Sequence, residues 1–333
     1  MADIYLVLAS TEAGVDRHLV LKRVLAERSR DPVFAQMFLD EARLAAQLQH
    51  PNIAQVYDVG KLDGAYFFTM EYVHGEDIRG VMRRLAKHKQ RMPENLALYI
   101  ASGALAALHH AHERTTPDGK PLNIVHRDVS PSNVMIGYEG VIKLVDFGVA
   151  KASERSQESR SGAIKGKIAY VSPEQCKGQS LDRRSDIYSL GIVMWEMLTG
   201  RRLYKRDSDF MSMLAVTNEP VPPPSELRPG LSADVERIVM TALEKDREKR
   251  FPTAAAMLEE IEAVATAERH LMTGSAMARF MREQFGTKPE PWIGLPPVET
   301  RGPEPAEPVT VTNQSLPGLG VAVSQRVSSE MLV

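Results

Sequence analysis

Two short stretches of this sequence hold polar side chains of the kind that bind a metal ion and accept a proton. HRDVSPSN covers residues 126–133 and VDFG covers residues 145–148, and both lie among apolar residues. Asn133 and Asp146 offer hard oxygen ligands that suit Mg²⁺, while Asp128 is a separate carboxylate that can accept a proton. HRD or DFG alone arises easily by chance. Their order along one chain, together with two charges upstream, makes the pattern specific.

Those two charges occur where an apolar environment is expected. Lys22 lies within the strand-like run HLVLKRV, and Glu41 lies in the apolar stripe of a helix predicted to begin after Asp31 and Pro32. An ionised group on a core-facing surface is costly unless an opposite charge meets it. The pattern therefore indicates an ion pair between Lys22 and Glu41, although two unrelated surface charges are the commoner explanation of any single Lys or Glu.

A further acid is expected to be buried at Asp186. It lies near the start of a helix predicted over residues 183–200, which is apolar on nearly every side and ends in a glycine. Asp186 therefore needs hydrogen-bond donors, either from the N-terminus of its own helix or from a neighbouring loop.

The elements that position these residues change character along the chain. Up to about residue 75 the sequence is strand-rich with one helix, and from about residue 76 it is mainly helical. The strands are expected at 4–10, 18–24, 53–60 and 65–72, with two short strand-like pieces at 123–129 and 141–147. The later helices are expected at 94–114, 183–200, 232–244 and 253–269. After about residue 287 the chain is proline-rich with little apolar periodicity, which predicts a disordered tail.

The composition is that of a globular protein rather than of a membrane or secreted one. The 333 residues carry a net charge of −2, which does not indicate binding to nucleic acid. The single cysteine, Cys176, excludes an internal disulfide framework. No membrane-spanning apolar run and no signal peptide are found in the sequence. The expectation is a cytoplasmic protein.

The motifs resemble those of the eukaryotic-like serine/threonine protein kinases of bacteria, over roughly residues 1–268. The resemblance implies an α+β, bilobal fold. A small antiparallel β-sheet lobe with one helix (1–73) would precede a larger, mainly α-helical lobe (76–268), a helical extension (269–286) and the tail (287–333). It also implies ATP and Mg²⁺ as cofactors, and transfer of the ATP γ-phosphate to Ser or Thr hydroxyls of protein substrates in a signalling role.

The resemblance assigns the catalytic roles position by position. Asp128 would accept or orient the proton of the substrate hydroxyl, and Asn133 and Asp146 would hold Mg²⁺. Lys22 would hold the α- and β-phosphates, with Glu41 as its partner. Positioning charges of this kind fit phosphoryl transfer, which needs charge neutralisation and in-line placement more than covalent participation by the protein.

The resemblance also assigns nucleotide-binding and structural positions. The stretch MEYVHGED (70–77) matches the hinge between the lobes, with Met70 as gatekeeper. The nucleotide-binding positions implied are Ala2, Ile4, Val20, Lys22, Met70, Glu71, Val73, Asp77 and Met135. The backbones of Glu71 and Val73 would meet the adenine, and Asp77 the ribose. Glu174 in SPE would pair with Arg250 in DREKRF. Asp186 would brace the stretch HRDVSPSN (126–133), which is the catalytic loop of the family.

The phosphate-covering loop departs most from the family pattern. Related kinases read G-x-G-x-x-G-x-V, whereas here Ala2 takes the place of the third glycine, Ile4 that of the valine, and the first strand and two glycines are missing. A four-stranded remnant would expose a new sheet edge and leave few backbone amides over the phosphates. Either Met1 is internal to a longer kinase, which the intact pattern after residue 3 favours, or the chain is a catalytically impaired, kinase-like scaffold.

A second departure exchanges two residues near the catalytic aspartate. Ser130 stands where most serine/threonine kinases have lysine, and Lys167 stands where they have threonine. Lys167 is therefore a candidate to restore the missing positive charge near the γ-phosphate; the alternative is that it points to solvent. The exchange also blurs the sequence cue for Ser/Thr over Tyr as acceptor.

Two serines of the activation segment are candidate phosphorylation sites. Ser159 and Ser161 lie near Arg155 and Arg160, and Arg127 adjoins the catalytic aspartate, so a phosphoserine could order the loop by charge-assisted hydrogen bonds. A serine-rich loop without regulation is the alternative. The extension at 269–286 is expected to pack on the large lobe, with partner binding as the other possibility. A small-molecule kinase of similar fold is a weaker alternative because SPE and the expected Glu174–Arg250 pair resemble protein kinases.

Overall fold

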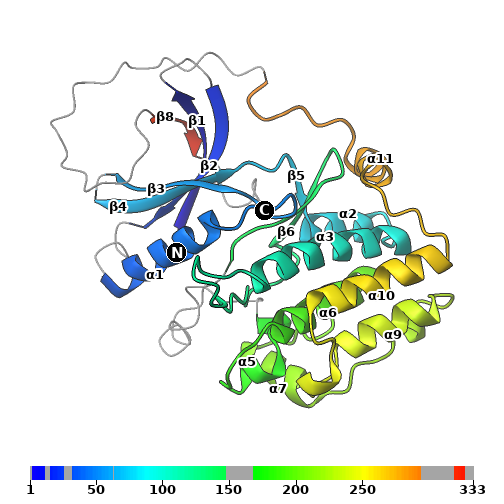
Figure 1. The fold of residues 1–333 in the computed structure, drawn as a ribbon. Coiled ribbons are helices and arrows are strands. Elements are labelled where there is room, and N and C mark those ends of the chain that lie inside the picture. The colour runs from blue at the N-terminus through cyan, green and yellow to red at the C-terminus, as the bar shows by residue number, and fades with distance from the viewer. Residues whose placement is uncertain are drawn as a thin grey trace. The chain divides into compact units, whose positions relative to one another are not determined.

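The computed structural model describes residues 2–11, 16–25, 32–62, 64–147, 168–293 and 319–326 (Figure 1). The chain forms two compact units. The small unit contains Met1–Ala46, Gln55–Tyr72 and Pro289–Val333, and the large unit contains Gln47–Ala54 and Val73–Lys288. The chain leaves the small unit between Tyr72 and Val73, within the stretch that matches the kinase hinge.

The small unit is an antiparallel sheet with one helix, as the sequence predicts. The strands are β1 (Ala2–Thr11), β2 (Asp16–Val24), β3 (Val56–Leu62), β4 (Ala65–Glu71) and β8 (Leu319–Arg326), and the helix is α1 (Pro32–Ala46). The strand order is β3-β4-β2-β1-β8. Phe38 of α1 packs against Phe68 of β4 with ring centroids 5.1 Å apart, which places α1 on the sheet face that carries Phe68.

The predicted exposed edge at β1 is wrong, because β8 pairs with it. The register runs from Tyr5 opposite Arg326 to Thr11 opposite Leu319, with one irregularity between Leu6 and Val7. The prolines that predict a disordered tail after residue 287 end at Pro317, and the following residues alternate between apolar and small or polar types. That alternation is typical of a strand rather than of a disordered tail.

The large unit is mainly helical around one buried helix. Its helices are α2 (Ile78–Lys87), α3 (Glu94–His112), α5 (Pro173–Cys176), α6 (Arg184–Thr199), α7 (Asp209–Asn218), α8 (Pro224–Leu227), α9 (Ala233–Ala242), α10 (Ala254–Ala267) and α11 (Gly274–Phe285). Every residue of α6 from Ser185 to Thr199 is buried, and the helix ends at Gly200, whose φ of 71° is left-handed. Figure 1 shows α3 lying alongside α10, a packing that the contacts between these helices also record.

A small three-stranded sheet of the large unit lies next to the catalytic stretch. It consists of β5 (Gly75–Asp77), β6 (Val134–Gly137) and β7 (Ile142–Leu144) in that order. The strand expected at 123–129 is instead a loop. Asn123 and Arg127 have φ of 49° and 66°, and the backbone N–H groups of His126 and Arg127 donate to the Asp186 carboxylate rather than to a neighbouring strand.

The extension after the last kinase-like helix packs on the large unit through α11. Ala276, Met277, Phe280 and Met281 are buried, and Arg84 Nε donates to the Gln284 carbonyl at 2.6 Å. Within the described part of the chain, no helix combines the length and the apolar character needed to cross a membrane.

Candidate active site

Asp186 joins the catalytic loop to α3 and α6. Its Oδ2 accepts hydrogen bonds from the His126 backbone N–H and the His112 ring, each at 2.8 Å, and its Oδ1 accepts from the Arg127 backbone N–H at 2.8 Å. Asp186, His112 and His126 are all nearly inaccessible to solvent. Of the two origins considered for the donors of Asp186, the neighbouring loop is therefore the observed one, and the carboxylate fixes the left-handed backbone at Arg127.

Replacing Asp186 by asparagine is expected to lower the free energy of unfolding by about 2–3 kcal/mol. An amide has one acceptor oxygen, so its NH₂ group would face at least one buried backbone donor. Urea unfolding measures the effect. The control is Asp234→Asn, which breaks an exposed pair with Arg237 and is expected to cost less than about 1 kcal/mol. Equal losses in both variants would contradict the structural role given to Asp186.

Asn133 is held by Asp128. Its Nδ2 donates to the Asp128 backbone carbonyl at 2.8 Å and to Asp128 Oδ2 at 2.9 Å. The amide nitrogen is thus occupied by Asp128, which leaves Oδ1 as the atom that can meet a cation, with the Ser132 hydroxyl 3.4 Å away. An amide oxygen such as Asn133 Oδ1 fits Mg²⁺, which takes oxygen ligands.

Asp146 has a backbone conformation that non-glycine residues rarely adopt, with φ of 56°. The stretch that leads to it is tied to the catalytic loop, because Val145 N donates to the Asn133 carbonyl at 2.9 Å and the His126 ring lies 3.1 Å from the Val145 carbonyl. The ring of Phe147 packs 4.5 Å from that of His126. Such strain persists only where the surroundings enforce it, and it is concentrated at functional sites.

In the small unit, five of the predicted nucleotide-binding residues occupy one face of the sheet, whereas Glu71, opposite Leu19, lies on the other face, and Val73 follows the sheet and belongs to the large unit. Ile4 is directly opposite Lys22, and Val20 is directly opposite both Leu6 and Met70, so these positions point to the same side. Ala2 shares the parity of Ile4 along β1 and lies on this face too. The same face packs on α1 through Phe68, which is opposite Lys22. Lys22 Nζ lies 5.6 Å from the centre of the Phe68 ring.

In the large unit, Asp77 and Met135 are opposite each other in the β5–β6 pair. Asp77 caps α2 through Oδ1, which accepts from the Gly80 N–H at 2.5 Å. Its buried Oδ2 makes no hydrogen bond to the described residues, and Arg79 Nε lies 3.5 Å away. Burial raises the pKa of Asp77, although the Gly80 N–H and Arg79 oppose that change. A buried acceptor with spare capacity fits the ribose hydroxyl that the resemblance assigns to this residue.

Glu174 and Arg250 form a buried ion pair. Arg250 Nη1 and Nη2 donate to the two Glu174 carboxylate oxygens at 2.7 and 2.9 Å, and the Ser185 hydroxyl donates to Oε1 at 2.7 Å. Burial alone would raise the pKa of Glu174, but the hydrogen bonds and charge of Arg250 outweigh it and hold the pKa below its ordinary value. The pair joins α5, which contains Glu174, to the connection between α9 and α10, which contains Arg250.

Several predicted residues cannot be placed in this site. Lys167, Ser159 and Ser161 lie outside the described residues, as does the side chain of Glu41. The proposed Lys22–Glu41 pair and the proposed exchange between Ser130 and Lys167 therefore stay predictions. Ser130 itself is buried, with its hydroxyl 3.1 Å from that of Ser132.

Two residues that support the catalytic loop, His112 and Gln175, are not predicted from the sequence. The His112 ring donates to Asp186, and Gln175 Nε2 donates to the Arg127 carbonyl at 3.1 Å. Gln175 also completes a capping box with Ser172 at the start of α5. The S-x-x-Q spacing was a usable signal for the cap. Nothing local in the sequence indicates either long-range hydrogen bond.

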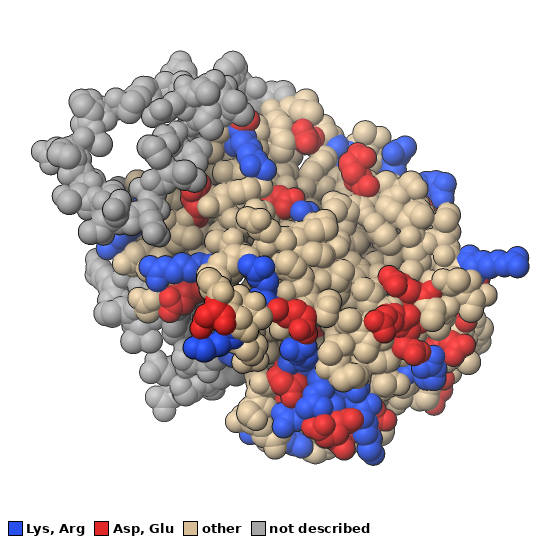
Figure 2. All heavy atoms as spheres, in the orientation of Figure 1, with Lys and Arg blue, Asp and Glu red and all other residues tan. Residues whose placement is uncertain are grey.

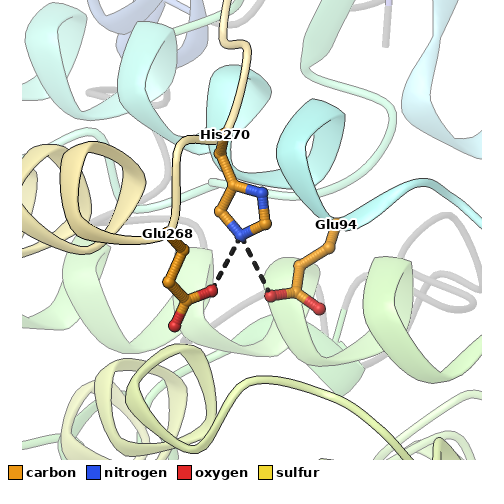
Figure 3. A group of neighbouring side chains, drawn as sticks. All are labelled: Glu94, Glu268 and His270. Atoms are coloured by element: carbon orange, nitrogen blue, oxygen red, sulfur yellow. Dashed lines mark hydrogen bonds and ion pairs between the residues drawn. The ribbon is translucent and has the colours of Figure 1, made fainter.

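A second group of chemically capable side chains lies away from the catalytic loop. His270 Nε2 lies 2.9 Å from Glu268 Oε2 and 3.4 Å from Glu94 Oε1 (Figure 3). Glu268 also accepts a hydrogen bond from the Ser232 hydroxyl. Each acid is thus already paired, and the cluster joins the end of α10 to the start of α3.

The two-unit fold and the catalytic loop define the class of protein. The arrangement consists of an antiparallel sheet with one helix, a helical unit, the Asp of HRD hydrogen-bonded to Asn133, and a strained Asp in DFG. It matches the protein kinase family, whose domain model aligns with residues 6–261. The chain belongs to that family.

Individual relatives are bacterial kinases. The chain is 40% identical over 288 residues to tyrosine-protein kinase MasK of Myxococcus xanthus, covering 86% of this chain and 44% of MasK. It is 35% identical over 266 residues to serine/threonine-protein kinase PknB of Mycobacterium leprae, covering 78% of this chain and 40% of PknB. The PknI kinase domain of Mycobacterium tuberculosis superposes with a TM-score of 0.59 at 26% identity, covering 79% of this chain and 90% of that one. The chain thus spans less than half the length of these two curated relatives.

Proposed function

We propose that the protein transfers the γ-phosphate of ATP to Ser or Thr hydroxyls of protein substrates, in a signalling role. The hydrogen bonds from Asn133 to Asp128 are the observation that carries the proposal, because they orient the carboxylate that meets the acceptor hydroxyl. Asn133 Oδ1 and Asp146 would hold Mg²⁺, which neutralises phosphate charge when bound. Asp186 fixes the backbone of the loop, and the face of β1, β2 and β4 with Lys22 would meet the nucleotide.

Tyrosine is the second candidate acceptor. It is favoured by the 40% identity to a relative named as a tyrosine-protein kinase, whereas relatives at 35% identity are named as serine/threonine kinases. Incubation with ATP labelled in the γ-phosphate, followed by phosphoamino acid analysis of a protein substrate, separates the two. We expect phosphoserine or phosphothreonine; phosphotyrosine alone would overturn the Ser/Thr assignment, and no label in any substrate would favour a non-catalytic scaffold.

Transfer is expected to require a divalent metal. Chelation with EDTA should abolish labelling, excess Mg²⁺ should restore it, and Asp146→Asn should lower the rate at saturating ATP by at least about 100-fold, because a carboxylate that neutralises phosphate charge is lost. The matched control is Asp207→Asn, an exposed position of the same unit, which should leave the rate unchanged. Labelling that persists in EDTA would contradict the metal assignment.

Phosphorylation of Ser159 or Ser161 is proposed as a regulatory step. Arg127 Nε is buried and makes no hydrogen bond to the described residues, so this guanidinium has donor capacity beside the catalytic aspartate. A phosphate with its strong acceptor oxygens suits such a donor. Mass spectrometry after incubation with ATP, compared with the Ser159→Ala and Ser161→Ala variants, identifies the modified residue.

A further inference from the structure

The large unit has a pocket beside the catalytic loop that is lined mainly by cations and apolar side chains. It lies among residues of α2, α6 and the segment after α6, and it includes Pro131, which follows Asp128 by three positions in the catalytic stretch. The Arg79 backbone N–H donates to the Pro131 carbonyl at 3.2 Å, which ties α2 to the loop. Four arginines line the pocket: Arg79, Arg83, Arg201 and Arg202.

The one acidic residue among the described lining residues is already occupied. Glu196 Oε2 accepts from the Tyr170 hydroxyl at 2.8 Å and lies 3.3 Å from Arg202 Nη1, while Oε1 accepts from the Leu203 N–H at 3.0 Å. The side chain of Glu196 is only 4% exposed. Burial raises its pKa, although Arg202, Tyr170 and the Leu203 N–H oppose that change. Both oxygens of Glu196 are therefore engaged and nearly inaccessible to a basic group of a ligand.

Two of the four arginines, in contrast, are not held in ion pairs with described residues. Arg202 shares Glu196, and Arg79 Nε lies 3.5 Å from Asp77 Oδ2. Arg83 and Arg201 are exposed, and neither lies within ion-pair distance of an acid in the described ranges, although the charge of Arg83 also opposes the rise in the pKa of Asp77. On the face drawn in Figure 2, acidic and basic side chains lie next to each other, in keeping with the net charge of −2. A pocket lined by four cations and one occupied acid is locally positive and attracts anions.

We propose that this pocket binds carboxylate side chains of the protein substrate, so that the kinase prefers acceptor hydroxyls with Asp or Glu nearby in the sequence. The inference rests on the proposed function and names the substrate class. Because Pro131 lies three positions after Asp128, an extended peptide whose hydroxyl meets Asp128 would present to the pocket a side chain about two to four positions away. Guanidinium groups suit this ligand because their forked donors match a carboxylate.

The test compares three peptides that share one acceptor and differ in the residues flanking it: Asp/Glu, Ala, or Lys. For the full chain we expect the highest kcat/KM with the acidic peptide, through a lower KM, and a preference that weakens as salt is added. Reversing both free charges, in Arg83→Glu/Arg201→Glu, should reduce the acidic-to-neutral ratio of kcat/KM by about 5–20-fold, as expected for two partly exposed charge contacts. The ratio is insensitive to the fraction of active enzyme because both peptides are assayed on one preparation.

The control is Arg237→Glu, an exposed arginine of α9 that should leave the ratio unchanged. Anisotropy of a fluorescent acidic peptide, with the same variants, gives a readout that needs no phosphoryl transfer. If the acidic peptide binds in a salt-sensitive way, the double variant loses this binding and no phosphoryl transfer is detected, then the pocket is supported and the proposed kinase activity is contradicted. Transfer with no acidic preference, or a ratio that the double variant does not change, would overturn the inference while leaving the kinase activity standing.

Discussion

Asp128→Asn is expected to slow phosphoryl transfer by about 10²–10⁴-fold at saturating ATP and substrate. The amide keeps the size of the carboxylate and can still accept the hydrogen bond that Asn133 Nδ2 donates at 2.9 Å. It cannot accept the proton of the attacking hydroxyl. The effect should therefore fall on kcat, with a smaller change in KM, and is measured by the rate of label transfer from ATP.

The control for this variant is a matched change at an exposed acid. Asp118→Asn lies in the turn before the catalytic stretch, and Asp118 is exposed. It should keep the parent rate. The free energy of unfolding of Asp128→Asn should also stay within about 1 kcal/mol of the parent, because the Asn133 contact is retained. A variant that is equally stable and equally active would show that Asp128 is not the proton acceptor.

The sequence predicted most where the signal is local. The strands around Lys22 and Met70 show β-branched and aromatic residues, and Ile4, Val20, Lys22 and Met70 share one sheet face because alternation along a strand is a local property. The helix over residues 183–200 was predicted nearly to its ends for the same reason: an uninterrupted apolar run closes at a glycine.

The rest depends on contacts between residues far apart in the chain. The segment at 123–129 has the composition of a strand. Its His126 and Arg127 backbone N–H groups instead donate to the Asp186 carboxylate, which lies 60 and 59 residues away in the sequence. Similarly, β8 is recognisable as a strand once the prolines end, but nothing in its own residues says that its partner is β1. Pairing between distant segments follows from the whole fold rather than from local propensity.

The second large effect is expected for the buried ion pair. Arg250→Met should lower the free energy of unfolding by about 3–5 kcal/mol, because it leaves the Glu174 carboxylate buried without its cation. Besides the two bonds to Glu174, the guanidinium donates to the carbonyls of Glu244, Lys245 and Arg184, and it lies 4.6 Å from the centre of the Tyr188 ring. Arg250→Lys should recover only part of the loss, since a single ammonium cannot match both carboxylate oxygens.

The contribution of the Glu174–Arg250 pair to the free energy of unfolding should depend on pH, and this dependence identifies its electrostatic origin. The folded-state pKa of Glu174 is held below the ordinary value of 4.5, so its stabilising contribution is complete above pH 4.5 and is lost as the pH falls toward the lowered pKa. In urea unfolding, the difference between the parent and Glu174→Gln should therefore be largest near pH 7 and shrink below pH 4.5. Arg237→Met, which breaks a half-exposed pair with Glu260, should cost less than about 1 kcal/mol. A Glu174→Gln difference that stays constant between pH 7 and pH 4 would assign the loss to packing instead of charge.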